Sequence, residues 1–370
     1  MTVTHIIQVS SYYPPHLGGQ ENAVQGLAQQ LAKAGHRVTV LTSTNGGGAP
    51  GVTTENGVTV HRMPSLVFGH APIMPQFAAA LLGAVTPGTV VHIHIGQAFT
   101  PEMVWLVSKL RGFAYIAQLH IDFEPSGPAG ILLPLYKKFV LKRALQSAAA
   151  VITLNQKTHR IVRRVYDYTG TALVMDNGID DSFFRLRRAP FTPHPPKTLR
   201  LLFVGRLTKQ KNLITLLYAL ALTKRAVQLD VVGEGPEREQ VEATIAQLKL
   251  KNVKLHGRLA REQVMKLYQT HDALIMPSLY EAQPLVLLEA MAARIPIIGT
   301  KVIGVEDHIA GVGILVKPTA EGLAHGIESY DTMYQQLPAM VKKGHDTVEK
   351  LRWPHILKKY ETLYEQATAH

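Results

Sequence analysis

A short apolar run, followed by a loop and a longer apolar segment, constrains the fold of this chain more than any other feature. Residues 272–276 form a run that Pro277 ends, as expected of a buried parallel strand. Residues 285–293 are apolar at nearly every position except Glu289, and they include neither glycine nor proline. A helix that is apolar on all sides is usually buried between a sheet and a second layer. The segment therefore predicts an α/β fold with a parallel sheet.

Two glutamates flank the start of this predicted helix. Glu281 lies in the loop before the helix, and Glu289 lies within it. In a parallel α/β sheet such loops lie at the carboxyl ends of the strands, where ligands bind. The alternative is that Glu281 caps the helix and Glu289 pairs with a basic neighbour, since buried acids are seldom left without a partner. The spacing by itself leaves both interpretations open.

Composition limits the classes of protein that this chain could represent. With 370 residues it is too long for one ordinary hydrophobic core, so we expect two domains. It has no cysteine, which excludes disulfides, thiolate metal ligands and a cysteine nucleophile. The formal net charge of +12 favours an anionic partner: a nucleotide phosphate, a nucleic acid or an anionic membrane. No zinc-finger or RNA-recognition pattern is present, so we expect no nucleic-acid partner.

The sequence has no stretch that is typical of a secretory signal or a membrane span. Residues 1–9 lack a basic segment with a long apolar core behind it, and no apolar run reaches about 18 residues. We therefore expect a cytoplasmic protein. Two basic stretches, over 131–150 and 156–166, read as helices that could press on anionic lipid at the inner face of the plasma membrane. The alternative is that both are solvated basic faces.

The first half of the chain alternates strand and helix patterns, beginning with a buried strand over 5–10 and a helix over 22–34. Gly18 and Gly19 lie at the helix entry. Paired glycines let backbone amides approach an anion, and a helix N-terminus adds partial positive charge. No G-x-G-x-x-G pattern is present, so a dinucleotide site is not specified, and a plain tight turn is the alternative.

Histidines mark two later strands of this half. The strand over 90–95 places His92 and His94 on the same face, because side chains alternate along a strand. No third residue follows at the spacing of a zinc ligand, so we expect one histidine to be structural and the other to border a cleft. The strand over 114–119 ends at His120, whose alternative role is a hydrogen bond to local backbone.

A proline-rich stretch over 185–198 predicts a linker between the two domains. The second domain begins with a strand over 199–204, and Gly205, Arg206 and Lys211 follow before a helix. A guanidinium fork and an ammonium group can share the oxygens of a diphosphate. The alternative is that the two cations are ordinary surface charges.

These motifs together resemble glycosyltransferase family 4, whose members move a sugar from a nucleotide sugar with retention of the anomeric configuration. The resemblance extends over essentially the whole chain, and its strongest pieces are these: Pro277-Ser278, Glu281, seven residues, Glu289 and Ala-Met-Ala; and Gly205-Arg206-Leu207 with Lys211. Weaker matches are Gly18-Gly19-x-Glu21, Asn177-Gly178-Ile179-Asp180 and Gly233-x-Gly235-Pro236. The chain departs from the family at Ala282-Gln283-Pro284, where Gly-Phe-Gly is common, and Pro284 has no amide hydrogen to offer a ligand. It also has Asn212 where glycine is usual.

The resemblance implies the GT-B fold, with two doubly wound Rossmann-like domains facing a central cleft. On this basis we expect a first, acceptor-side domain over 1–184 and the linker over 185–198. The nucleotide-sugar-binding domain would occupy 199–352. The terminal helix, over 353–370, would cross back to the first domain.

The resemblance also implies a set of site residues and a mechanism. The catalytic residues would be His120, Arg206, Lys211 and Glu281. The nucleotide-sugar-binding residues would be Gly18, Gly19, Gly205, Gly233, Gly235, Arg258, Leu285, Val286 and Glu289, with Glu21 as a weaker candidate. The two cations would stabilise the leaving diphosphate without a metal or other cofactor, Glu281 would hold sugar hydroxyls and Glu289 the ribose. No protein nucleophile is implied, because a phosphate oxygen would take the acceptor proton.

The donor and the acceptor are less well defined by the sequence. We expect a UDP-sugar, with a GDP-sugar as the alternative, and a lipid-linked glycan or a soluble small molecule as the acceptor. Two other functions stay open: a sugar-nucleotide 2-epimerase, which would need no acceptor, and a binding protein that holds the donor without turnover.

Overall fold

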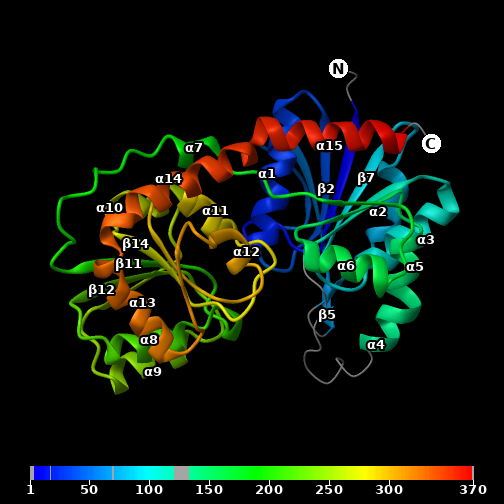
Figure 1. Ribbon diagram of the computed structural model, residues 1–370. Coiled ribbons are helices and arrows are strands. Elements are labelled where there is room, and N and C mark those ends of the chain that lie inside the picture. The colour runs from blue at the N-terminus through cyan, green and yellow to red at the C-terminus, as the bar shows by residue number, and fades with distance from the viewer. Residues whose placement is uncertain (1–3, 17, 69–70, 121–132, 369–370) are drawn as a thin grey trace. The chain divides into compact units, whose positions relative to one another are not determined.

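The chain folds into two compact units, described here from a computed structural model that covers residues 4–16, 18–68, 71–120 and 133–368. The first unit is Met1–Gly178 together with Trp353–His370, and the second is Ile179–Arg352. Each has a mainly parallel sheet with helices packed against it (Figure 1). Strands buried on both faces read as nearly continuous apolar runs, which explains the patterns in the sequence.

The sheet of the first unit has the strand order β10-β9-β8-β7-β1-β2-β4-β3, and all neighbours are parallel except β3 and β4. Its strands are β1 (His5–Ser10), β2 (Arg37–Ser43), β3 (Gly51–Glu55), β4 (Val58–Met63), β7 (Val90–Ile95), β8 (Tyr115–Leu119), β9 (Ala150–Thr153) and β10 (Thr171–Val174). A separate hairpin consists of β5 (Leu66–Phe68) and β6 (Ala71–Ile73).

The helices of the first unit are α1 (Gly19–Lys33), α2 (Phe77–Ala84), α3 (Thr100–Arg111), α4 (Leu133–Tyr136), a π-helical segment (Lys137–Leu141), α5 (Lys142–Gln146), α6 (Gln156–Arg164) and α15 (Trp353–Thr368). Helix α15 packs along α1 and reaches β7, which brings the end of the chain onto the first sheet (Figure 1). Its Tyr360 donates a hydrogen bond to Gln118 on β8, at 3.0 Å.

The sheet of the second unit is entirely parallel, with the order β13-β12-β11-β14-β15-β16. Its strands are β11 (Leu199–Val204), β12 (Val227–Val232), β13 (Val253–Gly257), β14 (Ala273–Met276), β15 (Ile297–Thr300) and β16 (Ile314–Val316). Its helices are α7 (Asp181–Phe184), α8 (Leu213–Leu222), α9 (Arg238–Gln247), α10 (Arg261–Thr270), α11 (Leu285–Ala292), α12 (Glu306–Ile309), α13 (Ala320–Thr332) and α14 (Leu337–Val348). Short 3₁₀ turns lie at Lys209–Lys211, Tyr334–Gln336 and Glu349–Leu351.

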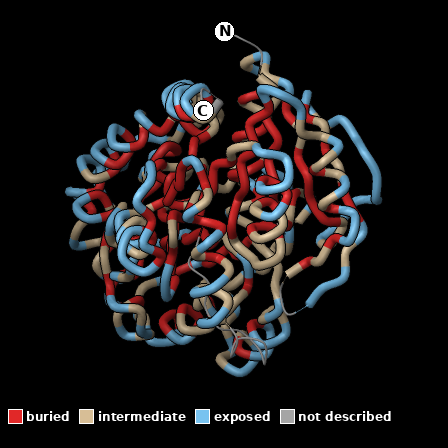
Figure 2. Tube along the Cα trace, turned by 90° about the vertical axis from the view of Figure 1, so that its right-hand side faces the viewer, coloured by how far each residue is buried: buried red, intermediate tan, exposed pale blue. Residues whose placement is uncertain are grey.

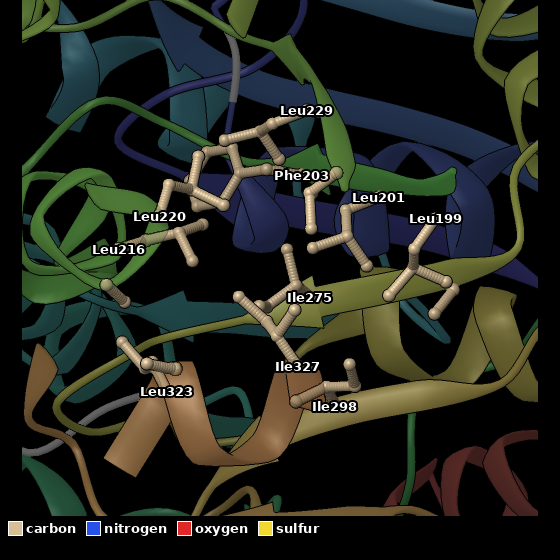
Figure 3. Close-up of a cluster of buried hydrophobic side chains, with 14 of the residues drawn as sticks. Leu199, Leu201, Phe203, Leu216, Leu220, Leu229, Ile275, Ile298, Leu323 and Ile327 are labelled. Atoms are coloured by element: carbon tan, nitrogen blue, oxygen red, sulfur yellow. The ribbon is translucent and has the colours of Figure 1, made fainter. Parts of the chain in front are cut away.

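The core of the second unit lies between its sheet and a layer formed by α8 and α13. Figure 3 shows Leu201 and Phe203 of β11 and Ile275 of β14 facing Leu216 and Ile327, which come from these two helices. Helices α10, α11 and α14 lie on the other side of the sheet (Figure 1). In both units buried residues follow the strands, while the outer turns of the helices are exposed (Figure 2).

The division between the units differs from the expected one. Residues 179–198 belong to the second unit, although the sequence led us to expect the first domain to run to residue 184 and a linker to follow. Phe183 packs edge-on against Tyr268, and Arg188 donates hydrogen bonds to the carbonyl oxygens of Tyr268 and His271. These side-chain anchors hold a proline-rich segment on the second unit, and its composition gave no sign of them.

Three local expectations also need correction. The helix expected over 131–150 ends at Gln146, because Ala150 begins β9 and pairs with β8; residues 131–132 lie outside the described part. The glycine-rich segment expected to be a flexible loop over 46–51 leads into β3, which pairs antiparallel with β4. The stretch over 63–75, expected to be a loop, contains the β5–β6 hairpin, whose Leu66 and Phe68 side chains are exposed.

Candidate functional site

The carboxyl ends of four strands in the second unit meet through their loops. The loop after β11 contacts the loop after β12, since the Gly205 amide donates to the Val232 carbonyl at 3.0 Å. A Cβ on Gly233 would lie 1.9 Å from the Gly205 carbonyl oxygen, and one on Gly235 would lie 2.3 Å from the Leu207 carbonyl oxygen. Backbone therefore packs on backbone here, which is sufficient reason for glycine at 233 and 235 whether or not a ligand binds.

The loop after β14 is held between its two neighbours. On one side the Leu279 amide donates to the Gln210 carbonyl at 2.8 Å, and on the other the Glu281 amide donates to the Ile303 carbonyl at 3.0 Å. Gly304 has a φ of +79°, and a Cβ there would lie 2.0 Å from the Glu281 carbonyl oxygen. Although the family's usual glycine pair is reduced to one at this turn, the remaining glycine permits a close contact with the site loop.

Lys211 and Glu281 form the centre of this group. Lys211 Nζ lies 2.6 Å from Glu281 Oε1, and Ser278 donates to the same oxygen from 2.7 Å. Both Glu281 and Ser278 are buried, and the Lys211 side chain is largely covered. The pair holds one cation and one carboxylate at fixed positions where the strands end. Sequence reasoning did not assign a role to Ser278, although it lies in the Pro-Ser part of the motif.

Asn212 explains how the loop after β11 turns into α8. Its φ of +55° and ψ of +35° are left-handed, a conformation that glycine adopts most easily and asparagine next. The Asn212 amide nitrogen Nδ2 also donates to the Pro277 carbonyl at 3.0 Å. The substitution of asparagine for the family's usual glycine is therefore compatible with the turn, and it adds a bond to the β14 loop.

Arg206 and Arg258 are exposed at the ends of β11 and β13. In the part of the chain that the structure describes, neither guanidinium has an ion-pair partner. Arg206 lies five positions before Lys211 in the same loop, so one free cation and one paired cation extend from it. This arrangement leaves Arg206 available to an anionic ligand.

Helix α11 follows Pro284 and begins with Leu285 and Val286, whose amides lie in the first turn and have no helical acceptor. Glu289 lies one turn further along and is partly buried. Burial raises the pKa of Glu289 to about 7, while the Arg261 guanidinium and the hydroxyl of Tyr268, 3.5 Å away, act in the opposite direction. Glu289 is thus a carboxyl group that changes charge near neutral pH. The sequence had not indicated Tyr268 or Arg261 as its neighbours.

The first unit holds a second group of residues from the sequence analysis. Gly18 precedes α1, and a Cβ on it would lie 2.0 Å from Glu21 Oε2, whereas a Cβ on Gly19 would meet no atom within 4 Å. Glu21 is buried in the first turn of α1, and its Oε1 lies 2.9 Å from His16 Nδ1. Gly18 is therefore required by packing, and Gly19 leaves open space beside the helix N-terminus.

His120 follows β8 and is buried in the first unit. Its amide donates to the Ile95 carbonyl at 3.1 Å, and its Nε2 lies 3.0 Å from Nδ1 of His94. Burial lowers the pKa of His120 to about 4, and the Glu21 carboxylate acts in the opposite direction. His120 is accordingly a neutral imidazole at physiological pH. Alternation along β7 placed His92 and His94 on one face, but the contact between His94 and His120 was not foreseen.

The described residues contain no group of three or more His, Asp or Glu side chains that could hold a metal ion. No helix within them is long and apolar enough to cross a membrane.

Family comparisons agree with this geometry. The second half of the chain, residues 187–346, matches the family described as glycosyl transferases group 1, and residues 17–183 match the family described as Glycosyltransferase Family 4. The chain is 26% identical to an uncharacterized glycosyltransferase of Methanocaldococcus jannaschii, and the match covers 98% of each chain. It is 22% identical to the phosphatidylinositol N-acetylglucosaminyltransferase of Arabidopsis thaliana, in a match to one of that enzyme's chains over 98% of this chain and 82% of that one.

A solved structure, HepE of Anabaena in complex with UDP and glucose, superimposes with a TM-score of 0.76 at 17% identity, over 98% of this chain and 100% of that chain. The two units are therefore the two Rossmann-like domains of the GT-B fold. The chain is a glycosyltransferase that belongs to the family 4 group of nucleotide-sugar enzymes.

Proposed function

We propose that this glycosyltransferase moves a hexosyl group from a nucleotide diphosphate sugar to an acceptor hydroxyl with retention at the anomeric carbon. The observation that carries the proposal is the loop group of the second unit, where Lys211 is paired with Glu281 and Arg206 is exposed without a partner among the described residues. A diphosphate leaving group gathers negative charge, and two fixed cations meet that need. Glu281 offers carboxylate oxygens to sugar hydroxyls beside them.

In the proposed reaction the bond between the anomeric carbon and the diphosphate oxygen breaks, and a bond to the acceptor oxygen forms on the same face. The acceptor proton passes to an oxygen of the departing diphosphate. No metal is needed, because Arg206, Lys211 and the first-turn amides of α11 stabilise the developing charge. Glu289 accepts hydrogen bonds from the ribose hydroxyls, and Arg258 lies at the end of β13, beside the expected nucleoside.

Glu281 and the proline at 284 bear on how the donor is held. The Ser278 hydroxyl and Lys211 both point to Glu281 Oε1, which leaves Oε2 as the oxygen with more freedom to accept from a sugar hydroxyl. Pro284 lacks an amide hydrogen, so contacts to phosphate at this helix start come from Leu285 and Val286.

A nucleotide panel tests the donor site. We favour a uridine nucleotide, as in the HepE complex, and the panel compares UDP, GDP, ADP and TDP by thermal shift. A ligand at about 100 times its dissociation constant adds about 2.7 kcal/mol of stability. One nucleotide should raise the melting temperature clearly, and the combined Arg206→Ala and Lys211→Ala variant should abolish that rise. If none of the four shifts the melt at millimolar concentration, the donor site is wrongly assigned.

Turnover separates the transferase from its alternatives. The matching radiolabelled nucleotide sugar should release nucleoside diphosphate only when an acceptor is present. Conversion of the donor alone to its 2-epimer would indicate an epimerase, and donor binding with no product under any condition would indicate a binding protein.

We also propose that the acceptor is lipid-linked and that the protein works at a cytoplasmic membrane face. The helical stretch over 133–146 exposes two apolar side chains, Leu135 and Phe139, at helical spacing with two exposed cations, Lys138 and Arg143. A face that joins apolar and basic side chains suits an anionic lipid surface. The relative whose name includes phosphatidylinositol supports a lipid acceptor. Helix α6 contributes less, because Arg163 donates to the carbonyl oxygens of Tyr168 and Gly170.

Vesicle sedimentation tests the membrane proposal. Vesicles containing anionic lipid should retain the protein at low salt, and the combined Leu135→Ser and Phe139→Ser variant should lose retention. Leu110→Ser, on the exposed side of α3, is the matched control and should bind like the wild type. No retention of the wild-type protein at low salt would leave a soluble acceptor as the better explanation.

A further inference from the structure

A chain of buried histidines crosses one face of the sheet in the first unit and ends at His120. His120 Nε2 lies 3.0 Å from His94 Nδ1, and the rings of His94 and His92 lie 4.2 Å apart. His92 Nδ1 in turn lies 2.8 Å from the hydroxyl of Tyr364 on α15. All three histidines are at most 5% exposed. The candidate active-site histidine is therefore held from behind by another histidine, and no bulk water takes part in that contact.

The two bonded histidines are both neutral. Burial lowers the pKa of His120 to about 4, and it lowers the pKa of His94 well below the usual value, with His92 and His120 adding to the effect. A neutral imidazole has one N–H donor and one bare nitrogen acceptor. Two neutral rings joined by one N–H···N bond share a single hydrogen between them. The tautomer of His94 therefore decides the tautomer of His120.

The surroundings of His94 favour one of its two tautomers. Its Nε2 is buried and has no hydrogen-bond partner among the described residues, whereas its Nδ1 faces His120. A buried N–H group without an acceptor is rarer and less tolerable than a bare acceptor nitrogen. The hydrogen of His94 is thus best placed on Nδ1, from which it is donated to His120 Nε2. The hydrogen of His120 is then on its own Nδ1.

We propose that His94 is a positioning residue that holds His120 in the Nδ1–H tautomer, so that His120 donates a hydrogen bond to the substrate and does not act as a base. The proposal rests on the transferase function given above and assigns a direction to the contact that His120 makes. A sugar hydroxyl or an oxygen that gathers charge would accept from Nδ1. The nearby Glu21 carboxylate, whose Oε1 is bonded to His16, also favours an N–H group on the ring of His120.

Two substitutions at His94 test the role. In His94→Leu the side chain fills similar space but cannot hydrogen-bond, so His120 loses its fixed tautomer. In His94→Asn a polar atom remains close to the position of Nδ1 and can still donate to His120. We expect kcat to fall about 10–100-fold in His94→Leu, as for groups that orient a functional histidine, and to recover most of that loss in His94→Asn. The KM for the donor and the thermal shift with nucleotide should stay near wild type in both.

Tyr364→Phe is the matched control, because it removes another buried hydrogen bond on the same sheet face without touching His120. It should lower the melting temperature by an amount similar to His94→Leu while kcat stays within about twofold of wild type. An equal loss of kcat in Tyr364→Phe and His94→Leu would overturn the proposal, since it would reduce both residues to core packing. Wild-type kcat in His94→Leu would overturn it too.

A spectroscopic measurement keeps this inference separate from the proposed function. Long-range ¹⁵N–¹H spectra of histidine-labelled protein distinguish the two neutral tautomers, and a His120→Asn variant identifies the His120 signals. We expect the Nδ1–H form of His120 in the wild type and a mixture in His94→Leu. An Nε2–H form in the wild type refutes the proposal even if the enzyme transfers sugar. The absence of any transfer, with the Nδ1–H form observed, refutes the transferase function and leaves the assigned tautomer intact.

Discussion

Replacing Glu289 with glutamine should stabilise the free protein at neutral and alkaline pH while it weakens nucleotide binding. Burial raises the pKa of this carboxyl group from 4.5 to about 7. The folded protein therefore holds the proton over a range in which the unfolded chain has lost it. Between about pH 4.5 and 7 the folded state binds more protons, so this group lowers the free energy of unfolding as the pH rises. Glutamine removes that cost, because it has no charge to bury.

The size of the effect follows from the two pKa values. A difference of about 2.5 corresponds to about 3.4 kcal/mol at most, at 1.36 kcal/mol for each pH unit. Glu289 is only partly buried, and solvent screens part of its charge, so we expect about 2 kcal/mol. In a domain of this size each kcal/mol moves the melting temperature by about 2–4 °C, which gives a rise of about 4–8 °C for Glu289→Gln.

The assay is a series of thermal melts between pH 4 and 9, with and without the nucleotide that the panel selects. Glu289→Gln should match the wild type near pH 4, where both states are protonated, and exceed it above pH 7. The same variant should bind nucleotide about 10–100-fold more weakly, because a charge-assisted hydrogen bond contributes about 1.5–3 kcal/mol. Glu239→Gln, an exposed acid on α9, is the control and should change neither property.

Two results would refute this reasoning. Melting curves of Glu289→Gln that coincide with the wild type at every pH would mean that the carboxyl group carries no desolvation cost. A stabilised variant with undiminished nucleotide affinity would mean that Glu289 is a buried acid of the fold, which is the alternative that its spacing in the sequence left open.

Three further substitutions test the loops around the site. Arg206→Ala should lower kcat by about 10²–10³-fold in a transfer assay, as the loss of one preorganised donor does, and a smaller change than about fivefold would exclude leaving-group stabilisation by this residue. Gly304→Ala should destabilise the protein by about 1–3 kcal/mol in denaturant melts, since its φ is +79° and its Cβ would meet the Glu281 carbonyl oxygen; an unchanged midpoint would contradict that contact. Asn212→Gly should keep the turn into α8 and change stability by less than about 1 kcal/mol, whereas Asn212→Val should cost more because a β-branched residue resists the left-handed conformation.

Much of the fold could be predicted from local patterns. The strands over 5–10, 90–95, 199–204 and 297–300 coincide with those of the structure, and the helix expected over 285–293 appears as α11. These segments are buried on both faces or all round, so their sequences are apolar throughout and leave little choice of structure. Segments on the surface were less readable: β3 and the β5–β6 hairpin follow from pairing between segments, which composition does not reveal.

The candidate site divides in a similar way. The motif spacing identified Arg206, Lys211, Glu281 and Glu289 as a set, because cations and carboxylates at strand ends of a parallel sheet suit a nucleotide sugar. The reason for glycine at 233 and 235 differed from the expected one, since both sites pack against the backbone of the neighbouring loop. A sequence pattern records that a side chain is absent, but the atom that excludes it belongs to a distant segment.

The sequence by itself therefore determined the α/β class, the order of the buried strands and the chemical types gathered at their carboxyl ends, because these depend on periodicity and on residues close together along the chain. Only the tertiary structure decided which of those residues touch. The pairing of Lys211 with Glu281, the raised pKa of Glu289 and the bond between His94 and His120 all join segments that are distant in sequence or depend on burial. Distances and desolvation arise only when the sheets and helices have packed, so no local pattern encodes them.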